Sequence, residues 1–213
     1  GGIRDDFYQS PFAIRRPDVL PDAGTPAVVR GSETFTALPN SPSNYQLSAL
    51  SLSGSEILHI QGAADRSPTY IQIIVTGNIS ISGAQAGIRL DPGVYARIFL
   101  EGDATIAGNG FINPNPPLNL QIYGVDPPPN PNGTPRLPGT IKIAGNGAFS
   151  GAVSAPSYDI EFKGGGNSDS IFGAFVGKTI TMTGVQSVHY DENLARSGLI
   201  TDFKIVSWFE DER

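Results

Sequence analysis

The stretch VTGNISIS, Val75–Ser82, contains two short runs of alternating apolar and polar residues, separated by Gly77 and Asn78. Alternation with period two is typical of β-strands that are buried on one face. Glycine and asparagine tolerate the left-handed backbone conformation at low steric cost, so they suit a bend in the chain. The stretch therefore predicts a strand, a corner and a second strand, with no reversal of chain direction.

The same arrangement returns in FLEGDATIAGNG, Phe99–Gly110, and in IKIAGNGAFSG, Ile141–Gly151. If such turns stack, each one covers the apolar face of its neighbour. We therefore expect an all-β fold, a right-handed parallel β-solenoid (β-helix) with loop insertions. The Gly-Asn pairs are unevenly spaced, and short strands between Gly and Asn corners also suit a β-sandwich, which is the alternative.

Three segments interrupt or flank the strand pattern. Residues 1–44 are rich in proline and predict an extended N-terminal arm, ahead of a β-solenoid domain over residues 45–213. The proline-dense segment 126–139 predicts a surface loop, because proline has no N–H to donate to a strand ladder. At the C-terminus we expect a cap, made of a short helix that begins at Asp191 and a strand that carries Trp208.

The composition excludes several classes of protein. The 213 residues are 39% hydrophobic and 16% charged, which is too apolar for a disordered chain. The absence of cysteine excludes disulfides and cysteine metal sites, and the net charge of −6 argues against nucleic-acid binding. No run approaches the ~20 apolar residues that cross a bilayer, so no membrane span is expected within the chain. The sequence does not tell whether an anchor or a signal precedes Gly1.

The blocks GNGAFSGAVSAP, Gly145–Pro156, and HYDENL, His189–Leu194, carry a resemblance over about residues 70–194. The sequence resembles a bacterial domain family of unknown function, often found C-terminally in PilX-type pilus-assembly and other surface-anchored proteins. The chain departs from that pattern at Ser154, where the family more often has Tyr or Ile-Tyr before Ala-Pro. The resemblance implies a β-rich module that is secreted or attached to the envelope, usually behind an N-terminal hydrophobic anchor, with no known activity.

We interpret the residues of these two blocks as structural rather than chemical. The alternative is a site formed by the histidine and acids of the second block, but such groups are common in structural hydrogen-bond networks. The residues concerned are Gly145, Asn146, Gly147, Phe149, Gly151, Ala155, Pro156, His189, Tyr190, Asp191 and Glu192.

Paired carboxylates are the main candidates for catalysis, because polysaccharide hydrolases need two acids that converge in a groove. Glu101 with Asp103, and Asp159 with Glu161, are spaced so that each pair would share one face of a strand. The simpler interpretation is a solvated acidic face beside a turn. We therefore expect no catalytic residue and no enzyme, and the sequence contains no phosphate loop or dinucleotide fingerprint that would indicate a cofactor.

Weaker patterns suggest ligands. His59 and His189 lie far apart in the sequence, and a metal site would need further ligands around them. The segment GGGNSD at 164–169 is a single copy of a calcium-type motif. The threonines of KTITMTG, 178–184, would form one rung of an ice-binding array, whereas several are needed. The strand tyrosines could form a glycan-stacking strip, although half-buried strand residues are the simpler interpretation. These tyrosines are Tyr45, Tyr70, Tyr95, Tyr123 and Tyr158.

From these observations we expect a non-catalytic cell-surface or envelope module with a role in adhesion or pilus-associated structure. The alternative is a carbohydrate-active β-helix enzyme or a glycan-binding module, and a calcium- or ice-binding module ranks third. The expected partner is a surface or pilus protein or a glycan, and the expected location is extracellular or in the cell envelope.

Overall fold

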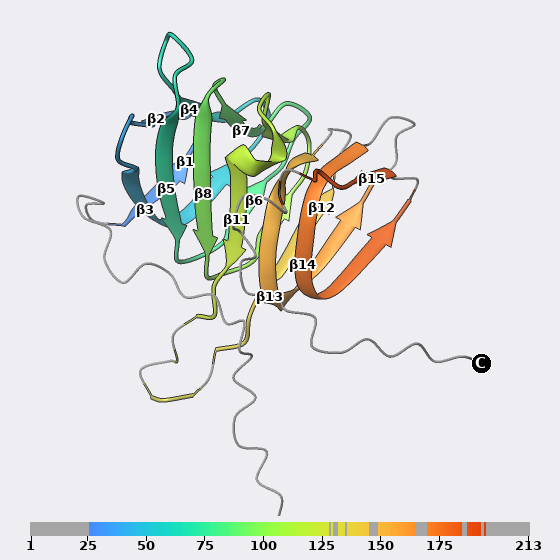
Figure 1. Ribbon diagram of the computed structural model, residues 1–213. Helices are drawn as coiled ribbons and strands as arrows, with labels where there is room; N and C mark the ends of the chain where they lie inside the picture. The colour runs from blue at the N-terminus through green and yellow to red at the C-terminus, as the bar shows by residue number, and fades with distance from the viewer. Residues whose placement is uncertain are drawn as a thin grey trace, which may run out of the picture.

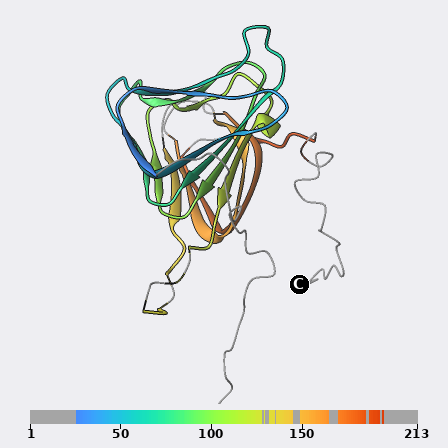
Figure 2. The ribbon, with the colours of Figure 1, turned by 90° about the vertical axis from the view of Figure 1, so that its left-hand side faces the viewer.

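The computed structural model describes residues 26–127, 129, 132–134, 136–144, 149–164, 170–184, 187–192 and 194. These residues form two sheets of parallel strands and one short 3₁₀ helix, η1 (Pro117–Asn119). Figure 1 shows the strands side by side, and Figure 2, turned by 90°, shows the chain winding around a common interior.

The strands fall into three rows, and each row collects strands that pair with one another. The groove row contains β5 (Thr69–Val75), β8 (Val94–Leu100) and β11 (Leu120–Gly124). The corner row contains β6 (Ile79–Ile81), β9 (Ala104–Ile106) and β12 (Thr140–Ala144). The third row contains β2 (Glu33–Thr36), β4 (Ile57–Gln61), β7 (Gly87–Leu90) and β10 (Gly110–Ile112). The remaining strands are β1 (Ala27–Arg30), β3 (Ser43–Leu52), β13 (Phe149–Lys163), β14 (Ser170–Thr183) and β15 (Ser187–His189).

Each turn of the chain pairs with the next turn in parallel. In the groove row Ile73 lies opposite Ile98, and in the corner row Ile79 lies opposite Ala104. All ladders between the named strands are parallel, and the isolated bridge from Leu38 to Tyr70 is antiparallel. A β-sandwich built from hairpins, our alternative prediction, is therefore wrong.

The all-β class is correct, but the right-handed β-solenoid is wrong, because eight of the parallel strands form a closed barrel. The ring runs β11-β8-β5-β3-β6-β9-β12-β13, and β13 pairs again with β11. Closure occurs because β13 is long: its Ala152–Ser154 segment pairs with Gln121–Tyr123 of β11, and its later residues pair with β12. The sequence marks strands and corners, but it does not show which strands pair at the end of the row.

The second long strand, β3, joins the groove row to the corner row at the opposite end. Its Ser43–Leu47 segment pairs with β5, and its Leu50–Leu52 segment pairs with β6. No glycine interrupts β3 between these segments, so one strand serves both rows. Between β3 and β13 the two rows are separated by glycine corners, and the two long strands close the ring around them.

The core consists of the inward side chains of all three rows. Ile73, Val75 and Ile81 are fully buried in one continuous apolar cluster, as their alternation predicts. The strand pattern of the sequence also led us to expect Phe99 and Ile180 to point inward, and both lie elsewhere. Phe99 packs in a separate cluster on the outer face, and Ile180 is 44% exposed on β14. The period-two pattern gives the two faces of a strand, but not which strands have a neighbour that covers them.

Glycines at the corner between the groove row and the corner row stack in a column. A Cβ on Gly77 would collide with the carbonyl oxygen of Ser48, and one on Gly102 would collide with that of Gly77. A Cβ on Gly139 would lie 2.6 Å from the carbonyl oxygen of Gly102. The backbones of successive turns therefore approach too closely for any side chain at these positions.

Hydrogen bonds between successive turns explain the asparagine after Gly77 and the aspartate after Gly102. The N–H of Asp103 donates to Asn78 Oδ1 at 3.0 Å, and the N–H of Thr140 donates to Asp103 Oδ1 at 2.8 Å. Each side chain thus satisfies a backbone donor of the next turn at the point where the strand ladder is interrupted.

The Gly-Asn pairs, however, do not all stack on one another. Gly77 stacks beneath Gly102, whereas Gly108 lies against Gly83 at a different corner. Two different corners with the same local chemistry account for the uneven spacing of the motif. Gly145, Asn146 and Gly147 lie outside the described residues.

Strands already form within the N-terminal segment that we expected to be an extended arm. Within the predicted arm 1–44, strand β1 pairs with β3 and strand β2 pairs with β4. The described residues of 126–139 contain no strand and leave the body between β11 and β12 (Figure 1). At the C-terminus the N–H of Leu194 donates to the carbonyl of Asp191 at 3.0 Å. The predicted cap strand with Trp208 lies outside the described residues and stays a prediction.

Candidate functional site

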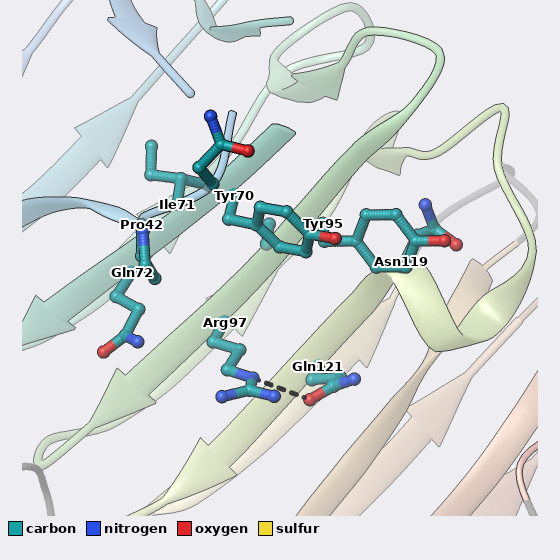
Figure 3. A pocket seen from close by; sticks show the side chains of 10 residues that line it. Pro42, Tyr70, Ile71, Gln72, Tyr95, Arg97, Asn119 and Gln121 are labelled. Carbon is teal, nitrogen blue, oxygen red and sulfur yellow. Dashed lines mark hydrogen bonds between the residues drawn. The ribbon is translucent and has the colours of Figure 1, made fainter. Parts of the chain in front are cut away.

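The outer face of the groove row carries a cavity of about 200 Å³, which we call the outer groove. Alternation along parallel strands in register places equivalent side chains next to one another on this face. Tyr70 lies opposite Tyr95, and Gln72 lies opposite Arg97, which in turn lies opposite Gln121. Figure 3 shows these side chains in two lines across the strands. The full lining is Asn40, Pro42, Tyr70, Ile71, Gln72, Tyr95, Ala96, Arg97, Asn119 and Gln121.

Two tyrosine rings form one side of the outer groove. The ring centroids of Tyr70 and Tyr95 are 5.3 Å apart, with an interplanar angle of 26°. Tyr70 is 37% exposed, a large fraction for an apolar ring on a sheet. The strand register holds the two rings side by side, as Figure 3 shows, so they offer a continuous aromatic surface.

The middle of the outer groove is held by the amide of Gln121. Its Oε1 accepts from Arg97 Nε at 3.2 Å and from the Tyr123 hydroxyl at 2.9 Å, while its Nε2 donates to the carbonyl of Leu118. Gln121 is buried, so its position is fixed from both ends of the amide. The bond at Nε orients the guanidinium of Arg97 and leaves its terminal nitrogens without a partner among the described residues.

The groove therefore offers two kinds of polar group: amides that are fixed by hydrogen bonds within the protein, and groups that make no such bond to the described residues. Asn119 is buried and donates to the carbonyl of Val94 at 2.9 Å, so its amide is fixed. The Gln72 amide makes no hydrogen bond to any described residue. Arg97 is the only charged residue in the lining described above, and no carboxylate or histidine belongs to that lining. The site suits binding through stacking and hydrogen bonds.

A small second cavity, about 40 Å³ in volume, adjoins the outer groove and shares Gln121 with it. It brings together the two sequence blocks that carry the family resemblance. Ala152, Val153 and Ser154 of the first block line it, together with Tyr190 and Leu194 of the second. The residues of these blocks were expected to be structural, and some of them form the wall of a cavity.

Beside this second cavity, Phe99 and Tyr123 form another aromatic pair on the outer face. Their ring centroids are 5.1 Å apart, and they pack with Ile74 and Val125. Burial raises the pKa of the Tyr123 hydroxyl, and the positive charge of Arg97 opposes that rise only in part. Tyr123 therefore stays protonated and donates to Gln121.

The tyrosines that we considered as one strip are divided between faces. Tyr158 is fully buried, with its hydroxyl 2.9 Å from the carbonyl oxygens of Leu100 and Val125. Tyr45 packs against the core and stacks on Phe35. Only the other three tyrosines of that set lie on the outer face of the groove row.

The structure does not unite the four acids that we weighed as catalytic candidates. Glu101 and Asp103 lie in the corner after β8 rather than within a strand, so strand alternation does not place them on one face. Glu101 is buried and Asp103 is exposed. Asp159 and Glu161 do share the outer face of β13, but they serve local contacts. Asp159 accepts from the Thr179 hydroxyl at 2.6 Å, and Glu161 lies 3.2 Å from Lys163 Nζ and 3.8 Å from Lys142 Nζ.

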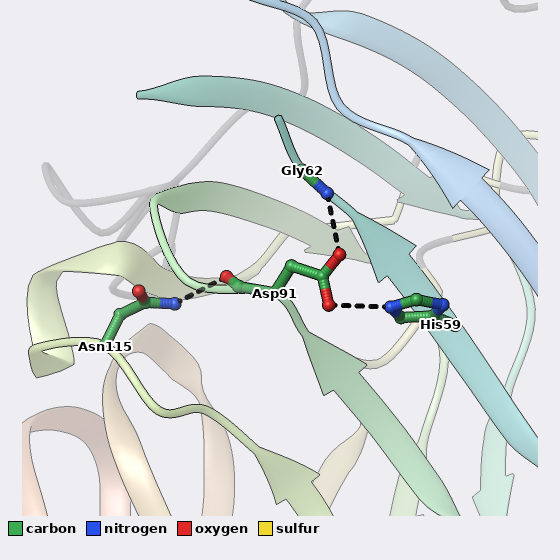
Figure 4. Close-up of polar contacts among 4 residues, drawn as sticks. All are labelled: His59, Gly62, Asp91 and Asn115. Atoms are coloured by element: carbon green, nitrogen blue, oxygen red, sulfur yellow. Dashed lines mark hydrogen bonds and ion pairs between the residues drawn. The ribbon is translucent and has the colours of Figure 1, made fainter. Parts of the chain in front are cut away.

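His59 pairs with an acid far from it in the sequence. Its Nε2 lies 2.8 Å from Asp91 Oδ1, and Asp91 also accepts from the N–H of Gly62 (Figure 4). Burial alone would raise the pKa of Asp91, but the hydrogen bonds from His59 and Gly62, with the nearby charges, lower it below 3.8. The Asn115 amide donates to the carbonyl of Asp91 at 3.0 Å. This network ties three turns of the chain together.

The weaker ligand patterns of the sequence gain no support from the described residues. They contain no cluster of three or more groups that could hold a metal ion. His189 is exposed and stacks on Phe172, with centroids 5.0 Å apart. The calcium-type segment 165–169 lies outside the described residues. The threonines of β14 lie opposite Asp159, Glu161 and Lys163, so the neighbouring strand does not continue a threonine array.

The motif residues of β13 take part in packing. Phe149 is buried against Phe111 and Phe175. Gly151 and Ala155 are buried as well, and Pro156 lies where the pairing of β13 with β14 shifts register. A proline suits that irregularity because it has no N–H to donate. Tyr190 is 58% exposed, and Asp191 and Glu192 belong to the segment that follows β15.

These features define an all-β protein with a closed parallel barrel and a polar-aromatic groove on its outer face. A family model described as "Domain of unknown function (DUF7305)" matches residues 51–197, and the chain belongs to this family. No curated protein matches the chain, and no solved structure does. Among the described residues, no helix has the length and apolar character needed to cross a membrane.

Sequence reasoning missed Gln72, Arg97, Asn119 and Gln121. Each lies on a strand or beside one, at a position that alternation assigns to the outer face. The signal was therefore present in each strand taken alone. Only the pairing register shows that these residues, far apart in the sequence, share one cavity.

Proposed function

We propose that the chain is a non-catalytic recognition module, displayed outside the membrane or in the cell envelope, that serves adhesion or pilus-associated assembly. One observation carries the proposal: the outer groove is lined by aromatic rings, amides and one guanidinium, with no carboxylate or histidine in its lining. Such a lining can hold a ligand, but it lacks the general acid and base that glycoside cleavage needs.

The closed barrel that carries the groove supports the same proposal. The groove side chains stand on three strands of a closed barrel, where backbone register fixes their spacing. A site on rigid strands keeps its shape without a ligand, as expected for a surface that binds repeatedly and releases its partner unchanged. Attachment behind an anchor, and a C-terminal place in PilX-type proteins, belong to this proposal through the resemblance of residues 70–194.

The test measures where the domain lies in the cell and whether it cleaves polysaccharides. In the source organism, we expect protease or an antibody added to intact cells to reach this domain. With the purified chain and a panel of polysaccharides, we expect retention on at least one polymer and no new reducing ends. Turnover that disappears when Glu101, Asp103, Asp159 and Glu161 are all replaced by their amides would contradict the non-catalytic assignment. A domain inaccessible in intact cells and located in the cytosol would contradict the surface assignment.

A further inference from the structure

We propose that the outer groove binds one pyranose unit of a carboxylated glycan, with the ring against Tyr70 and Tyr95 and the carboxylate on Arg97. This inference rests on the proposed recognition function and specifies its ligand class. The argument uses the size of the cavity, the aromatic surface, and the way in which the guanidinium is held.

The size of the cavity limits the ligand. At about 200 Å³ the outer groove is smaller than the roughly 300–1,000 Å³ of sites that enclose drug-sized molecules. One sugar ring fits, and a folded peptide segment does not. The groove opens on a sheet face, so neighbouring units of a chain can continue beyond both ends.

The aromatic surface matches the apolar face of a sugar ring. The two rings lie 5.3 Å apart on adjacent strands, where the register holds them. A pyranose presents C–H groups on its faces and hydroxyls around its edge. Stacking on tyrosine covers the C–H face and leaves the hydroxyls in the plane of the neighbouring polar groups.

The polar side chains of the outer groove favour a ligand that carries a negative charge. Nε of Arg97 is bonded to Gln121, and the two terminal nitrogens lie at the end of the side chain, one of them on the side of Gln121 in Figure 3. This end of a guanidinium presents parallel N–H donors that match the two oxygens of a carboxylate. No acid lines the cavity to compete for Arg97. The amide of Gln72, on the neighbouring strand, bonds to no described residue and can bind a sugar hydroxyl.

The experiment uses the whole chain and isothermal titration with oligomers of galacturonic, glucuronic and mannuronic acid. Each oligomer is compared with its carboxyl-reduced counterpart, which keeps the ring and loses the charge. We expect at least one acidic oligomer to bind about tenfold more tightly than its reduced form. Tyr95→Ala should abolish the binding, and Arg97→Gln should remove the preference for the acid. Arg89→Gln, which changes an exposed arginine on the third row, should leave both intact.

The outcomes separate this inference from the function on which it rests. Equal binding of acidic and reduced oligomers, or no effect of Arg97→Gln, overturns the carboxylate assignment and leaves a recognition module. Binding of none of the sugars, or binding that survives Tyr95→Ala, overturns the groove assignment. Shortened oligomers in the reaction would instead contradict the proposed non-catalytic function. Circular dichroism of each variant shows whether a loss of binding reflects a loss of fold.

Discussion

The groove row and the third row have the same interior and different outer faces. Inside, Ile73, Ile98 and Ile122 lie in line in the groove row, and Phe35, Ile60 and Leu90 lie in line in the third row. All six are buried in one cluster. Outside, the groove row places Gln72, Arg97 and Gln121 beside two tyrosines, whereas the third row places Thr34, His59 and Arg89 in line.

This difference shows which part of each strand is constrained by folding. The inward positions fill the same close-packed interior, and in both rows most of them carry branched or aromatic apolar residues. Outward positions do not line this interior, and their chemistry can differ from row to row. In the third row that chemistry serves the His59–Asp91 network between turns. In the groove row it forms a cavity.

The largest expected effect comes from breaking the glycine column between the groove row and the corner row. Gly102→Ala places a methyl group against the backbone of Gly77, where no flexible side chain can give way. We expect a loss of about 3 kcal/mol in the free energy of unfolding, or a failure to fold, measured by urea denaturation. Gly54→Ala is the matched control, because its φ is +58° but a Cβ there meets nothing within 4 Å. It should lose about 1 kcal/mol from backbone strain alone. Equal losses in the two variants would argue against the glycine column.

The second prediction compares the inside with the outside of the barrel. Tyr158→Phe removes a buried hydroxyl that lies 2.9 Å from two carbonyl oxygens. We expect a loss of about 1–2 kcal/mol, because a buried acceptor loses its donor. Tyr95→Phe, on the exposed face, should change stability by less than about 0.5 kcal/mol. Urea midpoints with unchanged slopes measure both variants. A larger effect at Tyr95 would mean that the groove face is part of the core.

The smallest expected effect concerns the network of the third row. The pKa of Asp91 is below 3.8 in the folded chain, so its ionised form stabilises the fold above about pH 4. That contribution is lost as the pH falls through the lowered folded pKa. With Asp91 and His59 each about one third exposed, we expect less than about 1 kcal/mol. Asp91→Asn should flatten the fall in stability between pH 5 and pH 3. An unchanged slope would show that Asp91 does not contribute.

The groove row gives a further prediction, whose expected effect on stability lies between those of Tyr158→Phe and Asp91→Asn. Gln121→Ala removes the acceptor shared by Arg97 and Tyr123, so we expect a loss of about 1 kcal/mol in stability and a mobile guanidinium. Relaxation of the arginine Nε–H signal by NMR measures that mobility. Gln72→Ala, on the same face without a bond to a described residue, is the control and should change neither. An equally rigid Arg97 in Gln121→Ala would remove the positioning role assigned to Gln121.

The sequence by itself determined most of the strands, the alternation along them and the positions of several bends. Val75–Ser82 contains the alternation and the Gly-Asn corner, and the structure has a strand, a corner and a strand there. These properties follow from local physics, since side-chain alternation and glycine conformation act over a few residues. The same alternation assigned Gln72 to the face opposite the core, but gave no reason to connect it with Arg97 on another strand.

Only the tertiary structure decided how the strands close and which outer residues meet. The pairing of β13 with both β11 and β12 closes the barrel, and a ladder between residues far apart leaves no periodic trace in the sequence. The corners at Gly77 and Gly108 look alike locally but stack on different partners, Gly102 and Gly83. The outer groove exists because register brings Tyr70 beside Tyr95 and Arg97 beside Gln121. Register is a property of paired strands, and no single strand contains it.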